Sequence, residues 1–135
     1  MGEQGTGESF SGKLVLDAGA LIALERGDRR VRALIKRKGI SGQVMVPTSA
    51  LAQVWRGGPR SAELALLIKL GHVDALDENR AKDIGVRLAA RGASDVTDGH
   101  VVCCAIESRA TVATSDPTDI NALTGPAEHL SLIAV

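Results

Sequence analysis

Aromatic side chains are almost absent from this sequence. Its 135 residues include one Trp, one Phe and no Tyr. The core must therefore be built from Leu, Val, Ile and Ala, and a surface that stacks single-stranded bases on aromatic rings is disfavoured. Hydrophobic residues make up 44% of the chain and charged residues 24%, as in ordinary globular proteins. The length suits one domain with a core of its own.

The chain also lacks an excess of charge, a metal-binding cysteine pattern and a long apolar run. Sixteen basic and sixteen acidic residues balance, so nucleic acid would have to bind a local patch. Cys103 and Cys104 are adjacent and show no Cys-x-x-Cys or Cys/His spacing, which favours buried free thiols in a reducing cytosol. We see no signal peptide and no run near the ~18 apolar residues of a membrane span, and we expect a cytoplasmic protein.

Strand and helix patterns alternate along most of the chain. The Gly-rich residues 1–12 are expected to form a disordered arm, and residues 13–135 a single domain. Five short strands separated by helices predict an α/β fold with a parallel five-stranded sheet covered on both faces. The expected strands are 13–17, 43–47, 72–76, 111–116 and 130–135, and the expected helices are 20–25, 28–38, 48–55, 61–70, 78–90, 98–108 and 119–123.

Acidic residues follow two of these strands and open one helix. Asp17 ends the first strand, Asp116 and Asp119 follow the fourth, and Asp95 and Asp98 enter an apolar helix. Ligands of parallel sheets bind beyond the carboxyl ends of the strands, where the strand order reverses. If the first and fourth strands are neighbours, the carboxylates surround one small volume. Their mutual repulsion would be relieved by a hard divalent cation, Mg²⁺ or Mn²⁺.

Each acid has an alternative role in capping or turning the chain. Asp95 and Asp98 stand at a helix entry, where an acid stabilises the helix by ~0.5–2 kcal/mol. Asp116 suits a turn, and Asp119 suits the cap of the next helix. Asp17 has the weakest alternative, because a buried strand end seldom tolerates an unpaired charge.

Basic residues cluster in the segment 26–38, which holds seven of the sixteen. They form either a solvated helix face or a surface for nucleic-acid phosphates or an acidic partner. Arg56 and Arg60 flank a Gly-Gly-Pro turn whose donors suit a phosphodiester, although the turn is equally a plain connection.

Four segments of the sequence resemble the motifs of PIN-domain proteins. "LDAGALIAL" is similar to the first motif and "VPTSALAQVWRGG" to the second. "DVTDGHVVCCAIESRATVATSDPTDI" is similar to the third and fourth. The motifs occur in the family's order, and the resemblance covers nearly all of residues 13–135.

The resemblance implies a three-layer α/β/α sandwich and the activity of the short bacterial members. These are VapC-type toxins, which are Mg²⁺-dependent ribonucleases paired with a small antitoxin and usually homodimeric. The resemblance makes Asp17, Asp98 and Asp116 metal-binding and catalytic acids and Asp119 an auxiliary acid. It also lets Ser49 and Ser115 hold a water molecule or a phosphate, with Arg56 and Arg60 near the substrate.

The second motif departs from the family pattern, because Gln53 stands where the family usually has Glu. Gln offers a neutral oxygen, which weakens the attraction for Mg²⁺, and Asp95 restores the charge if it faces inward. The alternative function is therefore a catalytically weakened PIN-like module that binds RNA or a partner. A phosphatase with Asp17 as nucleophile is disfavoured, because phosphatases of the haloacid-dehalogenase type have a second Asp two residues after the nucleophile and this sequence has Gly19 there.

Overall fold

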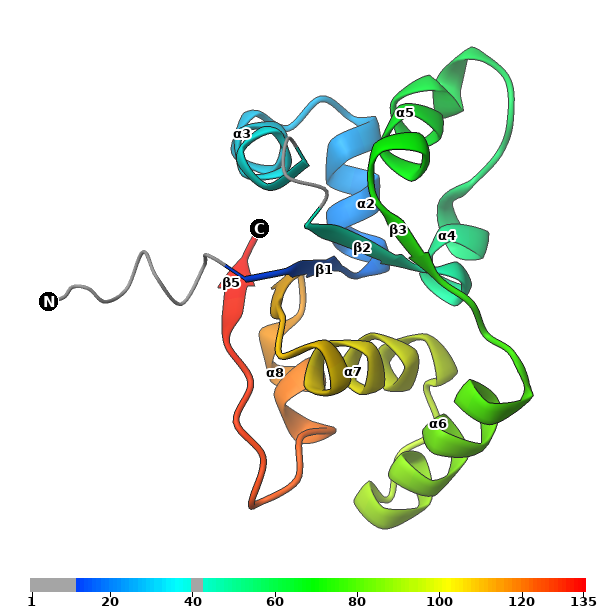
Figure 1. The fold of residues 1–135 in the computed structure, drawn as a ribbon, viewed down its shortest axis with the longest axis vertical. Helices are drawn as coiled ribbons and strands as arrows, with labels where there is room; N and C mark the ends of the chain where they lie inside the picture. The colour runs from blue at the N-terminus through cyan, green and yellow to red at the C-terminus, as the bar shows by residue number, and fades with distance from the viewer. Residues whose placement is uncertain (1–11, 40–42) are drawn as a thin grey trace, which may run out of the picture.

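The computed structural model describes residues 12–39 and 43–135. The expected disordered arm lies outside these residues except for Gly12. The described chain forms a five-stranded sheet of order β3-β2-β1-β4-β5, in which every strand pair is parallel (Figure 1). The predicted α/β fold with a parallel five-stranded sheet is confirmed. The strands are β1 (Leu14–Leu16), β2 (Val44–Pro47), β3 (His72–Asp74), β4 (Thr111–Thr114) and β5 (Leu132–Ala134).

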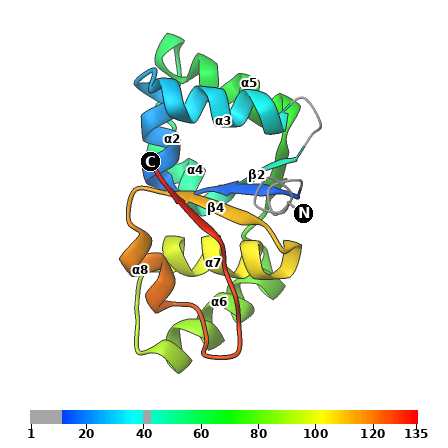
Figure 2. The same cartoon turned by 90° about the vertical axis from the view of Figure 1, so that its left-hand side faces the viewer.

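Helices cover both faces of this sheet and produce three layers (Figures 1 and 2). One face carries α2 (Ala18–Glu25), α3 (Arg29–Gly39), α4 (Thr48–Val54) and α5 (Ala62–Leu70), with a 3-10 turn, η1 (Pro59–Ser61), before α5. The other face carries α6 (Glu78–Arg91), α7 (Val96–Ser108) and α8 (Pro117–Ala122).

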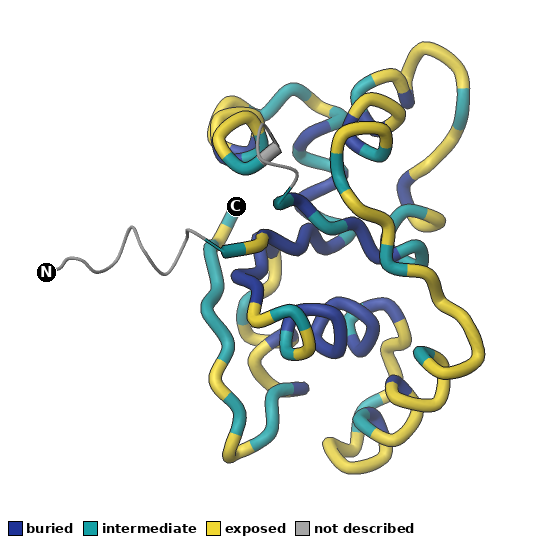
Figure 3. The backbone as a smooth tube through the Cα atoms, in the orientation of Figure 1, coloured by how far each residue is buried: buried dark blue, intermediate teal, exposed yellow. Residues whose placement is uncertain are grey.

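The two cores follow from the alternation of side chains along the strands. Leu14 and Leu16 of β1 point to one face and pack with α2 to α5, whereas Val15 points to the other and packs with α6 to α8. All three side chains are completely buried, as expected for a central strand covered on both faces. Burial is densest along β1 and α7, while α6 exposes most of its length (Figure 3).

Both cysteines lie in α7 and are buried and free. Burial raises the pKa of the Cys104 thiol to about 12, which keeps it protonated and unreactive. The prediction of buried free thiols is confirmed. Along the described residues, no helix combines the length and apolarity that crossing a membrane requires.

Three helices begin two residues earlier than predicted, α2 at Ala18, α7 at Val96 and α8 at Pro117, because the acid just before each is its cap. Helix α4 begins at Thr48 as predicted, with Pro47 as its N-cap and no cap from a side chain. The hydroxyls of Thr48 and Ser49 are engaged elsewhere, since Thr48 Oγ1 accepts from the Leu76 amide at 2.9 Å and Ser49 contacts α7.

Gly99 allows α7 to approach α6 closely. A Cβ at this position would lie 2.9 Å from Ile84 Cγ2 and 3.2 Å from Leu88 Cδ2, whereas a Cβ on Gly85 of α6 meets nothing within 4 Å. We expect Gly99→Ala to lower the free energy of unfolding by about 1–3 kcal/mol through overpacking. The control Gly85→Ala should raise it by about 0.5–1 kcal/mol through helix propensity. Urea unfolding of both variants tests this, and equal effects would contradict the packing.

Candidate active site

The candidate site lies where the strand order reverses, at the carboxyl ends of β1 and β4. These strands are neighbours, with Leu16 opposite Ala113, and β2 flanks β1 on its other side. Asp17 follows β1 directly, and Ser115 and Asp116 follow β4. Parallel strands bring their carboxyl ends to one edge, and a reversal leaves a crevice there because the two connections leave in opposite directions.

Asp17 is a buried carboxylate held by backbone and hydroxyl donors. Only 4% of the residue is exposed, and its Oδ1 accepts from the Ala20 amide at 2.8 Å, which caps α2. Thr114 and the Ser115 amide also hydrogen-bond to it. Burial nevertheless raises the pKa of Asp17, because desolvation outweighs these hydrogen bonds and the charge of Asp116 adds to it.

Thr114 joins the two strand ends at this edge. Its side chain is fully buried, and its Oγ1 accepts from the Asp116 amide at 2.8 Å while it hydrogen-bonds to Asp17. One hydroxyl therefore sets both the position of Asp17 and the start of the turn that carries Asp116.

Asp95 and Asp98 have separate roles at the start of α7. Asp95 is the N-cap, and its Oδ1 accepts from the Asp98 amide at 2.9 Å. Asp98 lies in the first helical turn, and its own carboxylate is free to face the sheet edge. Burial raises the pKa of Asp98 to about 6, and the charges of Asp95, Asp17, Asp119 and Asp116 add to this shift. The carboxylates of all three segments therefore interact at one edge.

Asp116 and Asp119 repeat this arrangement at the start of α8. Asp116 is the N-cap and accepts from the Asp119 amide at 3.4 Å. The carboxyl group of Asp119 hydrogen-bonds to that of Asp116, and this contact together with the neighbouring charge raises the pKa of Asp119. Two carboxyls in contact can share a proton or a cation.

The chemistry of this donor set fits a hard divalent cation. All of its ligands are carboxylate oxygens, and no ion pair between described residues neutralises any of the five acids. In residues 12–39 and 43–135, however, no three Asp, Glu, His or Cys side chains already form a group that could hold an ion. Asp17, Asp95 and Asp116 each use one carboxylate oxygen in capping a helix, which leaves the other oxygen of each for an ion.

The shifted pKa of Asp98 predicts how its replacement changes stability with pH. The folded pKa, about 6, exceeds the ordinary value of 3.8, so the charged group destabilises the fold above about pH 6. This cost declines as pH falls through 6 and vanishes below 3.8, where folded and unfolded forms are both protonated. We expect Asp98→Asn to stabilise the protein at pH 7 and to have little effect near pH 4. Urea unfolding across this range checks it, and a pH-independent difference would contradict it.

Gln53 lies beside the acids but is bound to α7. Its Nε2 donates to Thr97 Oγ1 at 2.8 Å, and Thr97 precedes Asp98 in the chain. One turn earlier in α4, Ser49 Oγ lies 2.7 Å from His100 Nδ1. These two hydrogen bonds fasten α4 to α7 next to Asp98.

His100 continues into a buried polar network that the sequence did not predict. Its Nε2 lies 2.7 Å from Asp74 Oδ2. Arg80 donates two hydrogen bonds to the same carboxylate, at 3.0 and 3.1 Å. Because the carboxylate only accepts, Nε2 carries the proton and Nδ1 accepts from the Ser49 hydroxyl. Burial lowers the pKa of His100, although the charge of Asp74 opposes it. Burial alone would raise the pKa of Asp74, but the hydrogen bonds from Arg80 and His100 outweigh burial, and the net effect is a lowered pKa.

A signal for Asp74 was present in the sequence. It is the last residue of β3, at the same edge of the sheet, so an acid at a strand end could have been noticed here as it was for Asp17. His100 is fully buried in an otherwise apolar helix, and only the folded structure reveals its partners.

The other predicted site residues, Ser115, Arg56 and Arg60, each contact a different part of the protein. Ser115 is exposed and adjoins Gly19, at which a Cβ would come 1.8 Å from Ser115 Oγ. Arg56 donates to the carbonyls of Trp55 and Gln53, at 2.8 and 3.0 Å, and so ends α4. Arg60 forms a 3.4 Å ion pair with Glu25.

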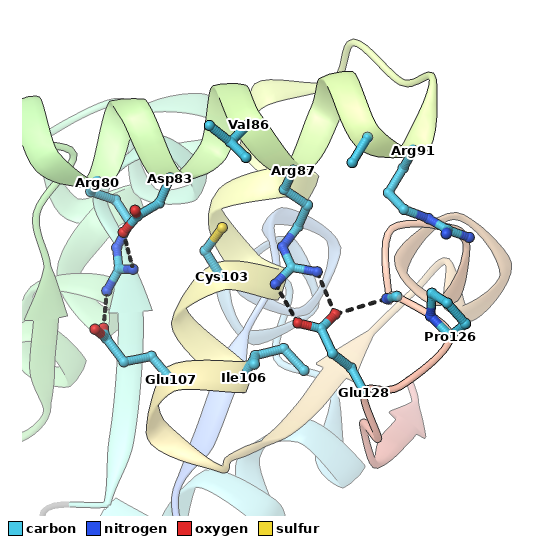
Figure 4. Close-up of a pocket in the computed structure, with 12 residues that line it drawn as sticks. Arg80, Asp83, Val86, Arg87, Arg91, Cys103, Ile106, Glu107, Pro126 and Glu128 are labelled. Carbon is cyan, nitrogen blue, oxygen red and sulfur yellow. Dashed lines mark hydrogen bonds and ion pairs between the residues drawn. The ribbon is translucent and has the colours of Figure 1, made fainter.

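A hollow of about 650 Å³ lies away from the acids, between α6, α7 and the turn before β5 (Figure 4), and none of the five carboxylates lines it. Its arginines are engaged by other groups. Arg87 donates to both oxygens of Glu128 at 2.6 and 2.9 Å, Arg80 pairs with Glu107, and Arg91 donates to the Ala122 carbonyl at 3.1 Å. The acids therefore remain the candidate active site.

Comparison with known proteins identifies the fold. Over 90% of this chain and 98% of the matched chain, the structure is similar to VapBC2 from Rickettsia felis bound to a DNA fragment from its promoter, with a TM-score of 0.67 and 12% identity. It is also similar to FitAcB from Neisseria gonorrhoeae, with a TM-score of 0.61 and 18% identity over 89% and 96%. The fold is PIN-like. No protein-family model and no curated protein matches the sequence.

Proposed function

We propose that this protein is a metal-dependent ribonuclease and the toxin of a toxin–antitoxin pair. The observation that carries the proposal is the group of carboxylates around Asp98, whose charges add to the effect of burial in raising its pKa to about 6. Acids gathered at a strand-order reversal are costly to the fold and useful to a cation-dependent reaction. The sequence resemblance to VapC-type toxins and the likeness in fold to VapBC2 and FitAcB support the toxin role.

The acids divide the work of phosphodiester hydrolysis between them. A Mg²⁺ or Mn²⁺ ion bound here supplies charge neutralisation and an acidic water molecule. Asp17, at the end of a central strand, and Asp116 and Asp119, at the start of α8 after the neighbouring strand, would hold the ion. The Asp98 carboxylate would accept the proton of the attacking water. The expected products carry a 5′-phosphate and a 3′-hydroxyl.

A partner surface for the antitoxin or for a second copy is available on α5. Leu66 and Leu70 are 57% and 56% exposed, and they line an apolar hollow of about 260 Å³ against α3. Isolated exposed leucines are common, but two on one helix beside an apolar hollow favour a covered surface. A small antitoxin and a homodimer are the partners that we propose.

The alternative, a binding module with little catalysis, is favoured by one observation. The side chain of Gln53 is neutral, and its amide nitrogen donates a hydrogen bond to the Thr97 hydroxyl. Such a module would bind RNA or a partner without metal-dependent turnover.

Restoring the charge at residue 53 tests whether this residue lines the metal site. In Gln53→Glu the new carboxylate accepts from the Thr97 hydroxyl and lies beside Asp98. One unit charge at ~4 Å is worth up to about 4 kcal/mol at an effective dielectric of 20. We expect heavy screening to leave at least about a tenfold gain in Mg²⁺ affinity, with faster cleavage at low metal. Isothermal titration measures it, and unchanged affinity would mean that residue 53 does not line the site.

Cleavage assays test the proposed function directly. The pure protein is incubated with structured and single-stranded RNAs in Mg²⁺, in Mn²⁺ and in EDTA. We expect cleavage with either metal and none in EDTA. Cleavage that persists in EDTA, or its absence under every metal condition, would contradict the proposal.

A further inference from the structure

A second hollow adjoins the acids and contains an arginine. It lies between the end of α2, the α2–α3 turn and the turn after β4, and its volume is about 480 Å³. Ser115 and Gly19 line the side nearest the acids, and Arg26 lines the far side. Ser115 sits between Thr114 and Asp116 in the chain, so this hollow adjoins the candidate active site, although none of the five acids lines it.

Gly19 keeps this hollow close to Asp17. A Cβ there would come 1.8 Å from Ser115 Oγ, 2.6 Å from Ser115 Cβ and 3.4 Å from Asp17 Oδ1. Only a residue without a side chain allows the turn after β4 to approach α2 this closely. The wall between Asp17 and the hollow is therefore thin.

Arg26 has no acid partner among the described residues, unlike the four arginines that form ion pairs. It is exposed and ends α2, and among described residues its guanidinium makes no hydrogen bond or ion pair. Four other arginines are paired with acids: Arg32 with Glu63, Arg60 with Glu25, Arg80 with Asp74 and Arg87 with Glu128. A guanidinium beside a hollow, with all its donors available, suits a phosphate.

The acid that shares this hollow is already neutralised in part. Asp28 Oδ1 accepts from the amides of Arg30 at 2.9 Å and Val31 at 3.1 Å, at the start of α3. Its carboxylate faces these amide donors. Among the described residues Asp28 thus forms no ion pair with Arg26, and the Arg26 guanidinium is available to an anion.

We propose that Arg26 binds a phosphate of single-stranded RNA, other than the one that is cut. The eight residues of α2 extend roughly 12 Å, which separates Arg26 from Asp17. RNA that reached the acids would thus pass a positive group on this side, although the protein has no net charge. This inference rests on the proposed function for its choice of RNA, and Arg26 is a substrate-positioning residue.

RNA-binding measurements on the full chain test this subsite. Fluorescence anisotropy of a labelled single-stranded RNA is recorded between about 50 and 200 mM salt, in the Asp17→Asn background so that the RNA stays intact. We expect Arg26→Ala to weaken binding about tenfold at low salt and to reduce the slope of log affinity against log salt by about 0.7, the value for one phosphate of a single strand. Arg26→Lys should keep the slope, because it keeps the charge.

The matched control is Arg37→Ala, which removes an exposed arginine from the last turn of α3. Arg37 precedes the start of β2 and therefore lies toward the amino ends of the strands, at the edge of the sheet opposite the acids. We expect Arg37→Ala to change RNA affinity less than about twofold. The subsite is overturned if Arg26→Ala binds RNA like its parent, or if Arg37→Ala weakens binding equally. Cleavage by the wild-type protein is measured separately, and its absence would refute the proposed function. In that case a reduction of the salt slope by about 0.7 in Arg26→Ala would still support the subsite.

Discussion

We expect Asp17→Asn to remove most of the proposed metal-dependent RNA cleavage without weakening the fold. Asn keeps the oxygen that accepts from the Ala20 amide, so the cap of α2 survives. The change removes a charge whose pKa is raised by burial, and stability at neutral pH should stay the same or rise. Mutating outer-shell partners of metal sites costs 10–100-fold, so losing a direct ligand should reduce the cleavage rate at least about a hundredfold.

Asp77→Asn is the matched control for this substitution. Asp77 caps α6 through the Arg80 amide at 2.8 Å, the same local role that Asp17 has in α2. It is exposed and lies outside the five acids. We expect cleavage within about twofold of wild type. Equal losses in the two variants, or full activity in Asp17→Asn, would remove Asp17 from the site.

Asp74→Ala is expected to lower the free energy of unfolding by about 3 kcal/mol. The substitution leaves the Arg80 guanidinium without its two-pronged partner and His100 Nε2 without an acceptor. The side chains of Arg80 and His100 are only 11% and 0% exposed, so water replaces the lost contacts poorly. Breaking a buried pair by removing one partner typically costs 3–5 kcal/mol, and the partial exposure of this one places it at the low end. Urea unfolding at pH 7 measures the change.

Asp83→Ala provides the comparison for Asp74. Asp83 meets the same Arg80 at 3.5 Å, but its side chain is 61% exposed. Pairs of this kind contribute little, and we expect a change below about 0.5 kcal/mol. Similar losses in both variants would show that the buried network adds no more than a surface ion pair.

The layers of the fold and the meeting of the acids could be predicted because each depends on local patterns. Leu14 to Leu16 form an apolar run that only a central strand buries, and parallel strands bring Asp17 and Asp116 to one edge. Which acid caps a helix was not predictable, since Asp95 and Asp98 are three residues apart and either can cap. The structure shows that Asp95 caps and leaves Asp98 available.

The polar contacts between helices could not be predicted from the sequence. Ser49 and Thr48 follow a strand and have the chemistry of caps, but their partners, His100 and Leu76, are remote in the chain. Thr114 looks like an ordinary strand residue, and its link to Asp17 exists only because β1 and β4 are adjacent. Tertiary contacts of this kind override local preferences because a buried hydroxyl must find a partner.

Paramagnetic mapping with Mn²⁺ tests the central claim most directly. Backbone amide signals of the ¹⁵N-labelled protein are followed by NMR as Mn²⁺ is added in small amounts. We predict that the amides of Asp17, Asp98 and Asp116 broaden first and together, and that Asp98→Asn weakens this effect. First broadening at other acids, such as Asp77 and Asp83 near the start of α6, would contradict a metal site at the carboxyl ends of β1 and β4.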